Sequence, residues 1–346
     1  MLKSAVVTLL LICLGAGTIS PAWSRNNSKA PAEINLRVQT TADLQKQFSA
    51  YGYNEYLPLK TYQIPPLYLE RLPRDWPAGT DDTLRSRLFI QILPPLALRL
   101  NQKLTAERLE IEKLNQSFAE QQKLSAAQNK RLEKLAEEYD TFTRLQGKAR
   151  QEYLLAELTL KVDNIPPSLL IAAAAIATDW GTSRAARQGN ALYKEYVWNE
   201  KTGLIPEDRA PGENYRIKTY PNLYASMTDF AAKINSHLNF AGFRSQRNAL
   251  RRNRSSLDGR SMAHNFIFDT HLQNYAGLLD YVVTFYDLGV LDKSSLADRV
   301  EKQPVAGNKD TKNSNNDKNC NKSVIGFLQK NKLLCNLRLK NIGKLT

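Results

Sequence analysis

Apolar side chains recur at helical spacing in two stretches of the first half of the chain. The first stretch follows a candidate cap at Asp81 or Asp82, and the second follows a polar break near Ser125. Because positions three and four apart share one face of a helix, this pattern predicts a helical hairpin region over residues 81–160. The repeating positions are Leu96, Leu100, Leu104, Ile111, Leu114 and Phe118, followed by Leu132, Leu135 and Tyr139.

Two features of this hairpin leave alternatives open. Pro94-Pro95 either interrupts the first helix or restarts it at a first turn. Packing against the domain that follows is favoured, since the repeat is too short and irregular for a long coiled coil. A partner-binding coiled coil remains the second interpretation.

Residues 161–292 are predicted to form one compact, mainly helical domain. Pro166-Pro167 stands at the start of a very apolar helix over Ser168–Thr178. Further helices are expected over residues 226–239 and 275–288. The stretch between, 189–214, is richer in Gly, aromatic and charged residues, which is typical of loops or a small hairpin lining a cleft.

The two ends of the chain differ from this central part. A charged start, an apolar run and Ala22-Trp23-Ser24 predict a signal peptide over residues 1–24, and hence an exported protein of the periplasm or cell envelope with no membrane span after cleavage. An uncleaved N-terminal anchor is the alternative. Residues 25–80 are polar and then rich in Tyr and Pro, and are expected to be extended or irregular. Residues 293–346 carry 12 Lys/Arg against 4 Asp/Glu and predict a basic linker with a short C-terminal helix over 324–339.

Charge and cysteine content restrict the chemistry. A formal net charge of +14 favours polyanionic surroundings, but the export signal and the lack of a nucleic-acid motif disfavour nucleic acid. Cys320 and Cys335 could form one disulfide. The three histidines have no metal-ligand spacing, so neither a metal nor another cofactor is expected.

Several motifs follow one another in a recognisable order. Within 84–291 this order resembles the glucosaminidase family that cuts bacterial peptidoglycan, and within it the Bax-type envelope proteins. The motifs are Val162-Asp163-Asn164-Ile165-Pro166-Pro167-Ser168-Leu169, Trp180-Gly181-Thr182-Ser183-Arg184, Gly189-Asn190-Ala191-Leu192-Tyr193, Gly203-Leu204-Ile205-Pro206, Ile234-Asn235-Ser236-His237-Leu238-Asn239-Phe240 and Tyr275-Ala276. The resemblance implies a mainly α fold: an α+β lysozyme-like glucosaminidase domain with a small β-lobe, preceded here by the helical hairpin.

The resemblance also implies a catalytic acid, which this chain lacks at the expected place. Glycosidic bonds are cleaved by carboxyl groups, one of which protonates the leaving oxygen. In the resembled family that acid is a Glu three residues before the Trp of the Trp-Gly-x-Ser motif, and the position is Ala177 here. Asp179 could replace it, but two residues along a helix rotate a side chain by roughly 200°, so a capping or exposed role is favoured.

Other site residues follow from the resemblance, each with a structural alternative. Glu213 could be a second carboxylate or a solvated loop charge, and Tyr275 could contact an acetamido group or be a buried structural tyrosine. The candidate substrate-binding residues are Trp180, Asn190, Tyr193, Trp198 and Tyr281, for which core packing or turn formation is the alternative. An Arg-rich segment, 244–260, could grip anionic polymers or form a solvated helix face.

Three functions remain open. The first is a protein that binds the glycan strands of peptidoglycan and whose hydrolysis is weak or lost. The second is a working N-acetylglucosaminidase that uses Asp179 or Glu213. The third is an envelope scaffold whose hairpin and basic tail bind a protein partner.

Overall fold

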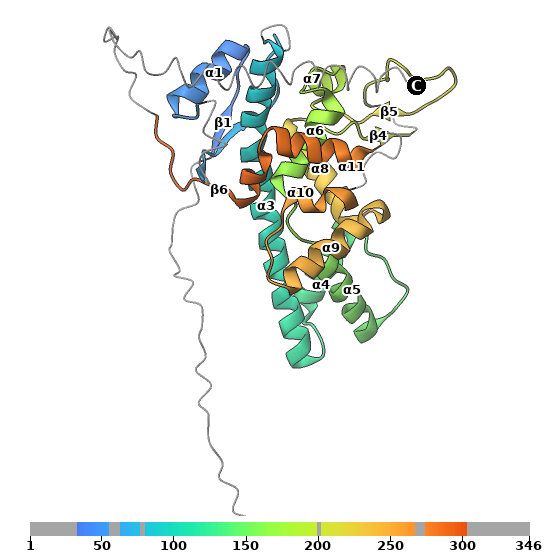
Figure 1. Cartoon of the computed structure of the whole chain (residues 1–346). Helices are drawn as coiled ribbons and strands as arrows, with labels where there is room; N and C mark the ends of the chain where they lie inside the picture. Colours follow the sequence, from blue (N-terminus) through green and yellow to red (C-terminus); the bar gives the residue numbers. More distant parts are fainter. Residues whose placement is uncertain (1–32, 55–62, 77–79, 199–201, 267–273, 303–346) are drawn as a thin grey trace, which may run out of the picture. The chain divides into compact units, whose positions relative to one another are not determined.

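One long helix, α3 (Asp82–Gln121), runs through the unit formed by the residues up to Lys302 and packs against helices and strands that precede and follow it in the sequence (Figure 1). The computed structural model describes residues 33–54, 63–76, 80–198, 202–266 and 274–302. Asp81 caps the helix by accepting a hydrogen bond from the amide of Leu84 (2.7 Å). At 1.5 Å per residue, the 40 residues of α3 span about 60 Å.

The helix α3 continues without a break through Pro94 and Pro95. A proline inside a helix removes one hydrogen bond and costs about 3 kcal/mol. All side chains from Leu88 to Leu98 are buried, the two prolines among them. Burial of this whole stretch offsets the two lost bonds, so neither prediction for the proline pair, interruption or restart, holds.

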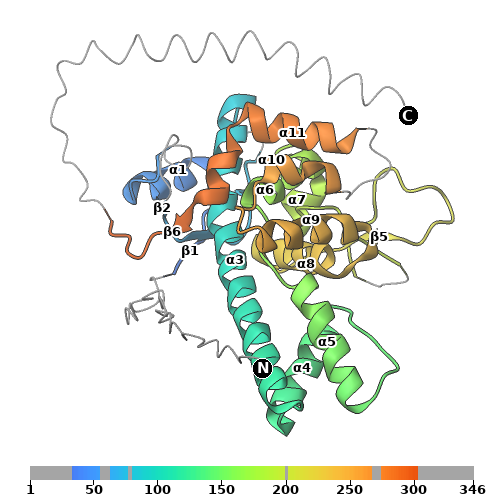
Figure 2. The ribbon, with the colours of Figure 1, turned by 60° about the horizontal axis from the view of Figure 1, so that its bottom comes forward.

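The lower half of α3 packs against two more helices rather than one. These are α4 (Ala126–Glu138) and α5 (Gly147–Lys161), which lie beside it in Figure 2. Arg131 of α4 makes two 2.8 Å hydrogen bonds to Glu110 of α3, and Arg150 of α5 makes two 2.7 Å bonds to Glu133 of α4. The region predicted as a hairpin is therefore a three-helix unit.

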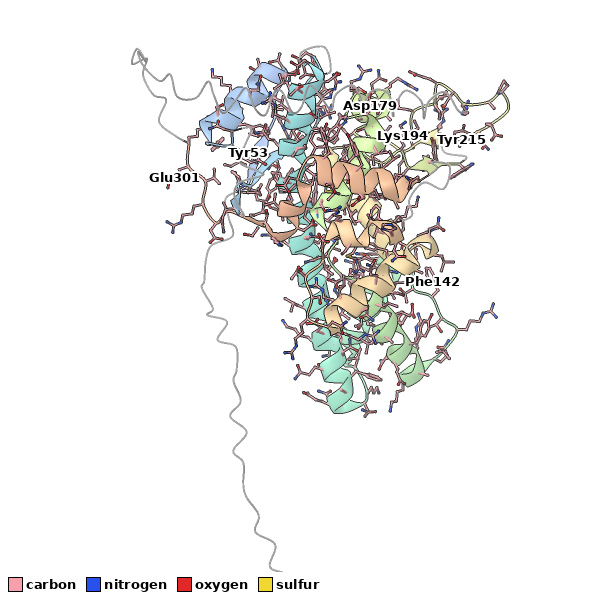
Figure 3. All side chains as sticks on the ribbon, viewed as in Figure 1. Tyr53, Phe142, Asp179, Lys194, Tyr215 and Glu301 are labelled. Atoms are coloured by element: carbon pink, nitrogen blue, oxygen red, sulfur yellow. The ribbon has the colours of Figure 1, made fainter. Side chains whose placement is uncertain are left out.

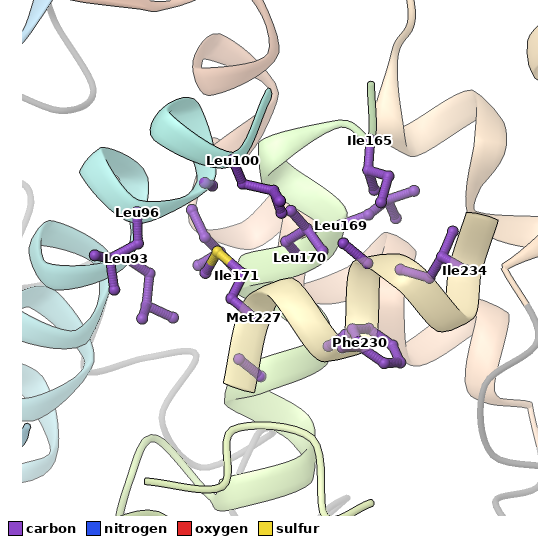
Figure 4. Close-up of a cluster of buried hydrophobic side chains, with 14 of the residues drawn as sticks. Leu93, Leu96, Leu100, Ile165, Leu169, Leu170, Ile171, Met227, Phe230 and Ile234 are labelled. Atoms are coloured by element: carbon purple, nitrogen blue, oxygen red, sulfur yellow. The ribbon is translucent and has the colours of Figure 1, made fainter. Parts of the chain in front are cut away.

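The apolar helix α6 (Pro167–Thr178) occupies the centre of the upper half. Only Ile176 and Ala177 among its residues are not fully buried. Figure 4 shows its leucine and isoleucine side chains between those of α3 and those of α8 (Leu223–Ser236). Asp292 caps its first turn by accepting hydrogen bonds from the amide and hydroxyl of Ser168 (2.9 and 2.7 Å).

The remaining helices and a small sheet complete this half. The helices are α7 (Arg184–Gly189), α9 (Ala241–Arg252), α10 (Gly259–Met262) and α11 (Tyr275–Phe285), with 3-10 turns η1 (Leu238–Phe240), η2 (Ala263–Asn265) and η3 (Leu288–Lys293). Strands β4 (Tyr196–Val197) and β5 (Arg216–Ile217) pair antiparallel, with Tyr196 opposite Ile217. They form a small β-lobe on a mainly α fold, which confirms the predicted class.

The N-terminal segment is more ordered than its sequence suggested. Strand β1 (Ile34–Leu36) pairs in parallel with β3 (Leu67–Leu69), and β2 (Gln63–Ile64) pairs in parallel with β6 (Ser295–Leu296). Helix α1 (Thr41–Ala50) begins with a capping box. Helix α1 departs from the expectation that residues 25–80 are extended or irregular, whereas strands β1, β2 and β3 are extended chain.

Two arginines of α9, Arg244 and Arg247, are structural. Arg244 donates to the carbonyls of Ile234 and His237 at the end of α8 (2.9 and 2.8 Å), and Arg247 donates to that of Lys161 at the end of α5 (2.7 Å). Cations at helix C-termini satisfy carbonyls that have no partner inside the helix. At these two positions the Arg-rich segment is thus neither a solvated face nor an anion-binding surface.

The residues up to Lys302 form one compact unit, so no boundary separates the three-helix region from the domain that follows. Among the described residues, no helix combines the length and apolar character needed to cross a membrane. The predicted signal peptide, Cys320, Cys335 and nearly all of the basic tail lie outside the described residues.

Candidate functional site

Ala177 lies in the last turn of α6, and its methyl group is half-buried. The next residue, Thr178, is buried; its hydroxyl donates to the carbonyl of Ala174 (2.6 Å) and accepts from the amide of Gly181 (2.9 Å). These two bonds tie the end of the helix to the turn after it. The position predicted for the catalytic acid is thus at a well-fixed point that solvent partly reaches, and it carries no carboxyl group.

The turn after α6 consists of three consecutive residues with positive φ. Asp179, Trp180 and Gly181 have φ values of 49°, 55° and 81°. A Cβ at Gly181 would lie 2.8 Å from the Cδ1 of Leu72, so only glycine fits there without displacing its neighbours. The sequence Asp-Trp-Gly therefore ends the helix abruptly. The turn also sets the directions of the Asp179 and Trp180 side chains.

Asp179 is the C-cap of α6 and is exposed. Its carboxylate accepts a hydrogen bond from the hydroxyl of Thr182 (3.0 Å), three residues further along the same turn. The helix ends before Asp179, so helical rotation no longer decides its direction. The side chain is instead held on the turn toward α7, at the upper edge of the view in Figure 3.

Trp180 is half-buried between α3 and the end of α11. Its ring packs against those of Phe89 (centroids 6.0 Å apart) and Tyr286 (4.6 Å). Its carbonyl accepts a hydrogen bond from the indole of Trp76 (3.1 Å). These contacts fix the turn beneath Ala177 to the body of the protein.

Asn190 and Tyr193 are both buried. Asn190 ends α7 with a positive φ of 51°, and its amide donates to the carbonyl of Tyr220 (2.9 Å). Tyr193 stacks on Phe230 with centroids 4.0 Å apart and donates its hydroxyl to the carbonyl of Leu170 (3.3 Å). The ring faces of Tyr193 are therefore not accessible to a sugar.

The two tyrosines of α11 lie differently. Tyr275 is buried at the first position of the helix, close to Tyr193; burial, together with the neighbouring Tyr275, raises the pKa of the Tyr193 hydroxyl well above its usual value. Tyr281 is half-buried and stacks on Phe285 (5.5 Å). The structure thus brings Tyr275 close to Tyr193.

The β-lobe carries an aromatic cluster formed by Tyr196, Trp198 and Tyr215. The ring of Tyr196 lies 6.4 Å from that of Trp198 and 5.3 Å from that of Tyr215. Trp198 is 61% exposed and Tyr196 is 44% exposed. Glu213 is also exposed, in the turn that precedes β5.

A small apolar cluster joins this lobe to α7 and so to the end of α6. Ala185 and Ala191 pack against Ile217 of β5, with Leu204 and Tyr220 at the edge. The guanidinium of Arg184 also donates to the carbonyl of Ile205 and pairs with Glu207 at 3.0 Å. Ala177 and the aromatic cluster consequently belong to one connected part of the molecule.

Sequence reasoning missed one carboxylate in this region. Glu195 lies just before β4, and its side chain is 12% exposed and paired with Lys233 of α8 at 2.6 Å. Burial raises the pKa of Glu195, and the hydrogen bond from Lys233 opposes that shift. Nothing in the local sequence marked it, because its partner is 38 residues away.

Two other surfaces are hollowed, and neither includes a predicted site residue. One groove of about 770 Å³ lies along α4, and one of about 320 Å³ lies between α1 and α3. In the part of the chain that the structure describes, no three His, Cys, Asp or Glu side chains gather in a way that could hold a metal ion.

Comparison with known proteins identifies the family. A family model described as "Glucosaminidase: Mannosyl-glycoprotein endo-beta-N-acetylglucosaminidase" matches residues 155–327, half of the chain. The chain belongs to the glucosaminidase family. The matched segment includes α6 and the β-lobe. Because it begins within α5, it does not include α3, which ends at Gln121.

Two individual proteins are also similar. The chain is 26% identical over 191 residues to Protein bax of Escherichia coli (strain K12), a match that covers 55% of this chain and 64% of that protein. It thus spans less than two thirds of the length of this relative. The catalytic domain of the autolysin Auto from Listeria monocytogenes is 19% identical, with 49% of this chain and 98% of that chain covered; the TM-score of 0.29 is too low for any argument on the fold.

Proposed function

We propose that this glucosaminidase-family protein binds the N-acetylglucosaminyl glycan strands of peptidoglycan and hydrolyses them weakly or not at all. The observation that carries the proposal is that alanine occupies position 177, where the family resemblance implies a catalytic Glu. A methyl group stands at the half-buried end of α6, and the helix has no carboxylate anywhere along Pro167–Thr178.

A substitute acid would need a suitable environment as well as a suitable position. A glycosidase acid stays protonated because a partly apolar wall raises its pKa. Asp179 is exposed and hydrogen-bonded to Thr182, and Glu213 is exposed in a loop. Neither side chain has an apolar wall around it, which disfavours transfer of the acid role to either of these two residues.

Glycan binding is supported by the aromatic cluster of the β-lobe. Sugar rings present apolar faces that pack on the flat faces of Trp and Tyr, and such rings bury a large area at low entropic cost. Trp198 and Tyr196 are held by Tyr215 while much of their surface stays exposed. In this proposal Trp198 and the end of α6 contact the glycan, whereas Trp180, Asn190 and the buried Tyr275 position the chain beneath it.

The decisive experiment compares three proteins on purified peptidoglycan sacculi: the wild type, Ala177→Glu and Ala177→Gln. We expect the wild type to cosediment with sacculi and to release almost no soluble glycan fragments. Ala177→Glu should release fragments, since it restores a carboxyl group at the end of α6. Ala177→Gln is the matched control, because it has the same shape without an acid, and it should remain inactive.

Two outcomes would contradict the proposal. Efficient fragment release by the wild type, lost in Asp179→Asn or Glu213→Gln, would establish a working enzyme with a displaced acid. Absence of sacculus binding would favour a role as a scaffold for other envelope proteins.

We further propose that the protein acts in the cell envelope after export. The apolar N-terminal run and Ala22-Trp23-Ser24 support this location, as does a glycan ligand. Fractionation of cells that produce the tagged protein tests it. A cytoplasmic protein that still carries residues 1–24 would contradict the proposal.

A further inference from the structure

Helix α8 holds the chain that enters the β-lobe at three successive points. Each point pairs one residue of the helix with one residue of the segment 192–195: Ser226 with Leu192 (2.9 Å), Phe230 with Tyr193 (4.0 Å between ring centroids) and Lys233 with Glu195 (2.6 Å). Positions 226, 230 and 233 are three and four residues apart, so they lie on one face of the helix. The last of these contacts comes directly before Tyr196, the first residue of the aromatic cluster.

The chain that leaves the β-lobe is held by the same helix. Asp229 of α8 accepts hydrogen bonds from the ammonium of Lys218 (2.8 Å) and the hydroxyl of Tyr220 (2.7 Å), which both follow β5 closely. The amide of Lys218 also donates to the carbonyl of Glu195 (2.8 Å), and this bond joins the two sides of the lobe. Charged groups thus fix both sides to one turn of α8, between Asp229 and Lys233.

Glu195 is the least compensated member of this network. Its Oε2 accepts the bond from Lys233, but its Oε1 is buried and accepts no hydrogen bond from the residues that the structure describes. The charged groups that face it are Lys233 and Asp229 of α8 and Lys218 after β5. Burial raises the pKa of Glu195 in spite of Lys233, because burial penalises the charged form. An ionised Glu195 therefore depends on Lys233 to remain in this position.

We propose that Lys233 and Glu195 are positioning residues of the glycan site: their ion pair holds β4 so that Tyr196 and Trp198 meet the glycan strand in one orientation. Helix α8 packs against α6 (Figure 4), so a lobe fixed to α8 is also fixed relative to Ala177. The proposal rests on the proposed function, because it assumes that the aromatic cluster binds glycan. Neither member of the pair is expected to touch the glycan.

The test measures the affinity of the immobilised full-length chain for glycan strands freed of their stem peptides, from pH 8 to pH 5. At pH 7, Lys233→Met leaves the buried carboxylate unpaired, which favours release of the lobe. If the fraction of molecules with a held lobe falls to about a tenth, the apparent Kd rises about tenfold, which is the loss we expect. A merely structural role for Lys233 would lower the melting temperature without changing the affinity of the folded protein.

Two further results distinguish the ion pair from other effects of the substitution. A carboxyl group whose pKa is raised by burial favours the buried conformation once it is protonated, so the affinity of Lys233→Met should recover toward that of the wild type as the pH falls. The double variant Lys233→Met, Glu195→Gln has no charge to bury and should bind nearly like the wild type at every pH. Lys134→Met is the matched control, since Lys134 pairs with Glu138 (3.8 Å) on α4, and it should bind like the wild type.

Hydrogen exchange of the Lys218 amide at pH 7, without glycan, tests the pair independently of binding. Exchange should be faster in Lys233→Met than in the wild type, because this amide donates to the carbonyl of Glu195. If the wild type binds no glycan strands, the proposed function fails, and the exchange rate alone decides the role of the pair: unchanged exchange in Lys233→Met would overturn it.

With binding by the wild type, two results would overturn the proposal. One is wild-type affinity in Lys233→Met at pH 7. The other is a loss of affinity that neither acidification nor the added Glu195→Gln reverses. Lys233→Gln, which keeps a hydrogen-bond donor without the charge, takes the place of Lys233→Met if that variant does not fold, and the same outcomes apply to it.

Discussion

At the scale of single residues, the buried charges of this protein serve to join segments distant in sequence. Asp163 lies between α5 and α6, is 3% exposed, and receives two hydrogen bonds from Arg251 (2.9 and 2.8 Å). Arg247 donates to the carbonyls of Asp163 (3.1 Å) and Lys161 (2.7 Å), and to the side chain of Asn235 (2.8 Å). The start of the α6 segment is therefore anchored by a charged network rather than by apolar packing alone.

Removal of the central arginine should destabilise the protein severely. Arg247→Met would leave a buried carboxylate with less compensation and several carbonyls without a donor, at a cost of about 3–5 kcal/mol in the free energy of unfolding. Arg252→Met, an exposed position on the same helix, is the control and should change that free energy by less than about 0.5 kcal/mol. Urea unfolding followed by circular dichroism measures both, and equal small effects would show that the network contributes little.

The same network predicts a defined pH dependence. Burial alone would raise the pKa of Asp163, but Arg251, Arg247 and Arg108 prevail and lower it. A carboxylate with a lowered folded pKa contributes stability that is complete above its unfolded pKa, about 4, and is lost as the pH falls further. We expect the stability difference between wild type and Asp163→Asn to be constant from pH 5 to 7 and to shrink below about pH 4. A difference that grows on acidification would contradict this assignment.

At the scale of elements, the turn after α6 depends on a glycine for two reasons. Gly181 has a φ of 81°, and a Cβ there would meet Leu72 at 2.8 Å; Gly212 has a φ of 88° but no atom within 4 Å of the same point. Gly212→Ala should therefore cost only the backbone strain, about 1–2 kcal/mol. Gly181→Ala should cost a further ~1–3 kcal/mol for overpacking.

Thermal unfolding of the two glycine variants gives the comparison directly. Because Gly181 also fixes Asp179 and Trp180, its variant should in addition change the near-ultraviolet circular dichroism of the tryptophans, and the Gly212 variant should not. Equal melting temperatures would show that Leu72 moves aside at little cost.

The sequence predicted well those elements in which the spacing of apolar residues and the residues at the ends of the element indicate the same structure. Pro166-Pro167 and the following apolar run indicated α6 to within one residue of its start. Helix α5 was missed because its apolar positions, Leu154, Leu155 and Leu158, are few among charges. Helix α1 was missed although Thr40 and Asp43 form a capping box, since its surroundings are polar.

The candidate site was predictable only in part, and for a related reason. The absence of a carboxylate at Ala177 can be read from the motif order, and Asp179 as a cap follows from the turn residues. The burial of Tyr193 and the ion pair between Glu195 and Lys233 depend on contacts with α8, which local sequence does not encode. The sequence motifs thus identified candidate site residues, but they did not indicate which of these residues are buried and which are exposed to solvent.

At the scale of the whole molecule, the family domain is completed by residues outside its matched segment. Leu93, Leu96 and Leu100 of α3 cover α6 in Figure 4, and Leu72 and Trp76 support the turn after it. These residues all precede position 155, where the family match begins. The position occupied by Ala177 therefore depends on a part of the chain that lies outside the segment matched by the family model.

This dependence predicts that residues 155–327 do not fold alone, whereas residues 33–327 do. Without α3 the apolar face of α6 would be exposed to water, and each large side chain left uncovered loses about 1.5–3 kcal/mol, against a total stability of only about 5–15 kcal/mol for a domain. The shorter fragment should bind a hydrophobic dye, lack near-ultraviolet dichroism and unfold in urea without a cooperative transition. The longer fragment is the control, and it should unfold cooperatively and retain sacculus binding. A cooperative transition in the shorter fragment would show that α3 covers a core that is already stable, and the position of Ala177 would then be fixed by the family segment alone.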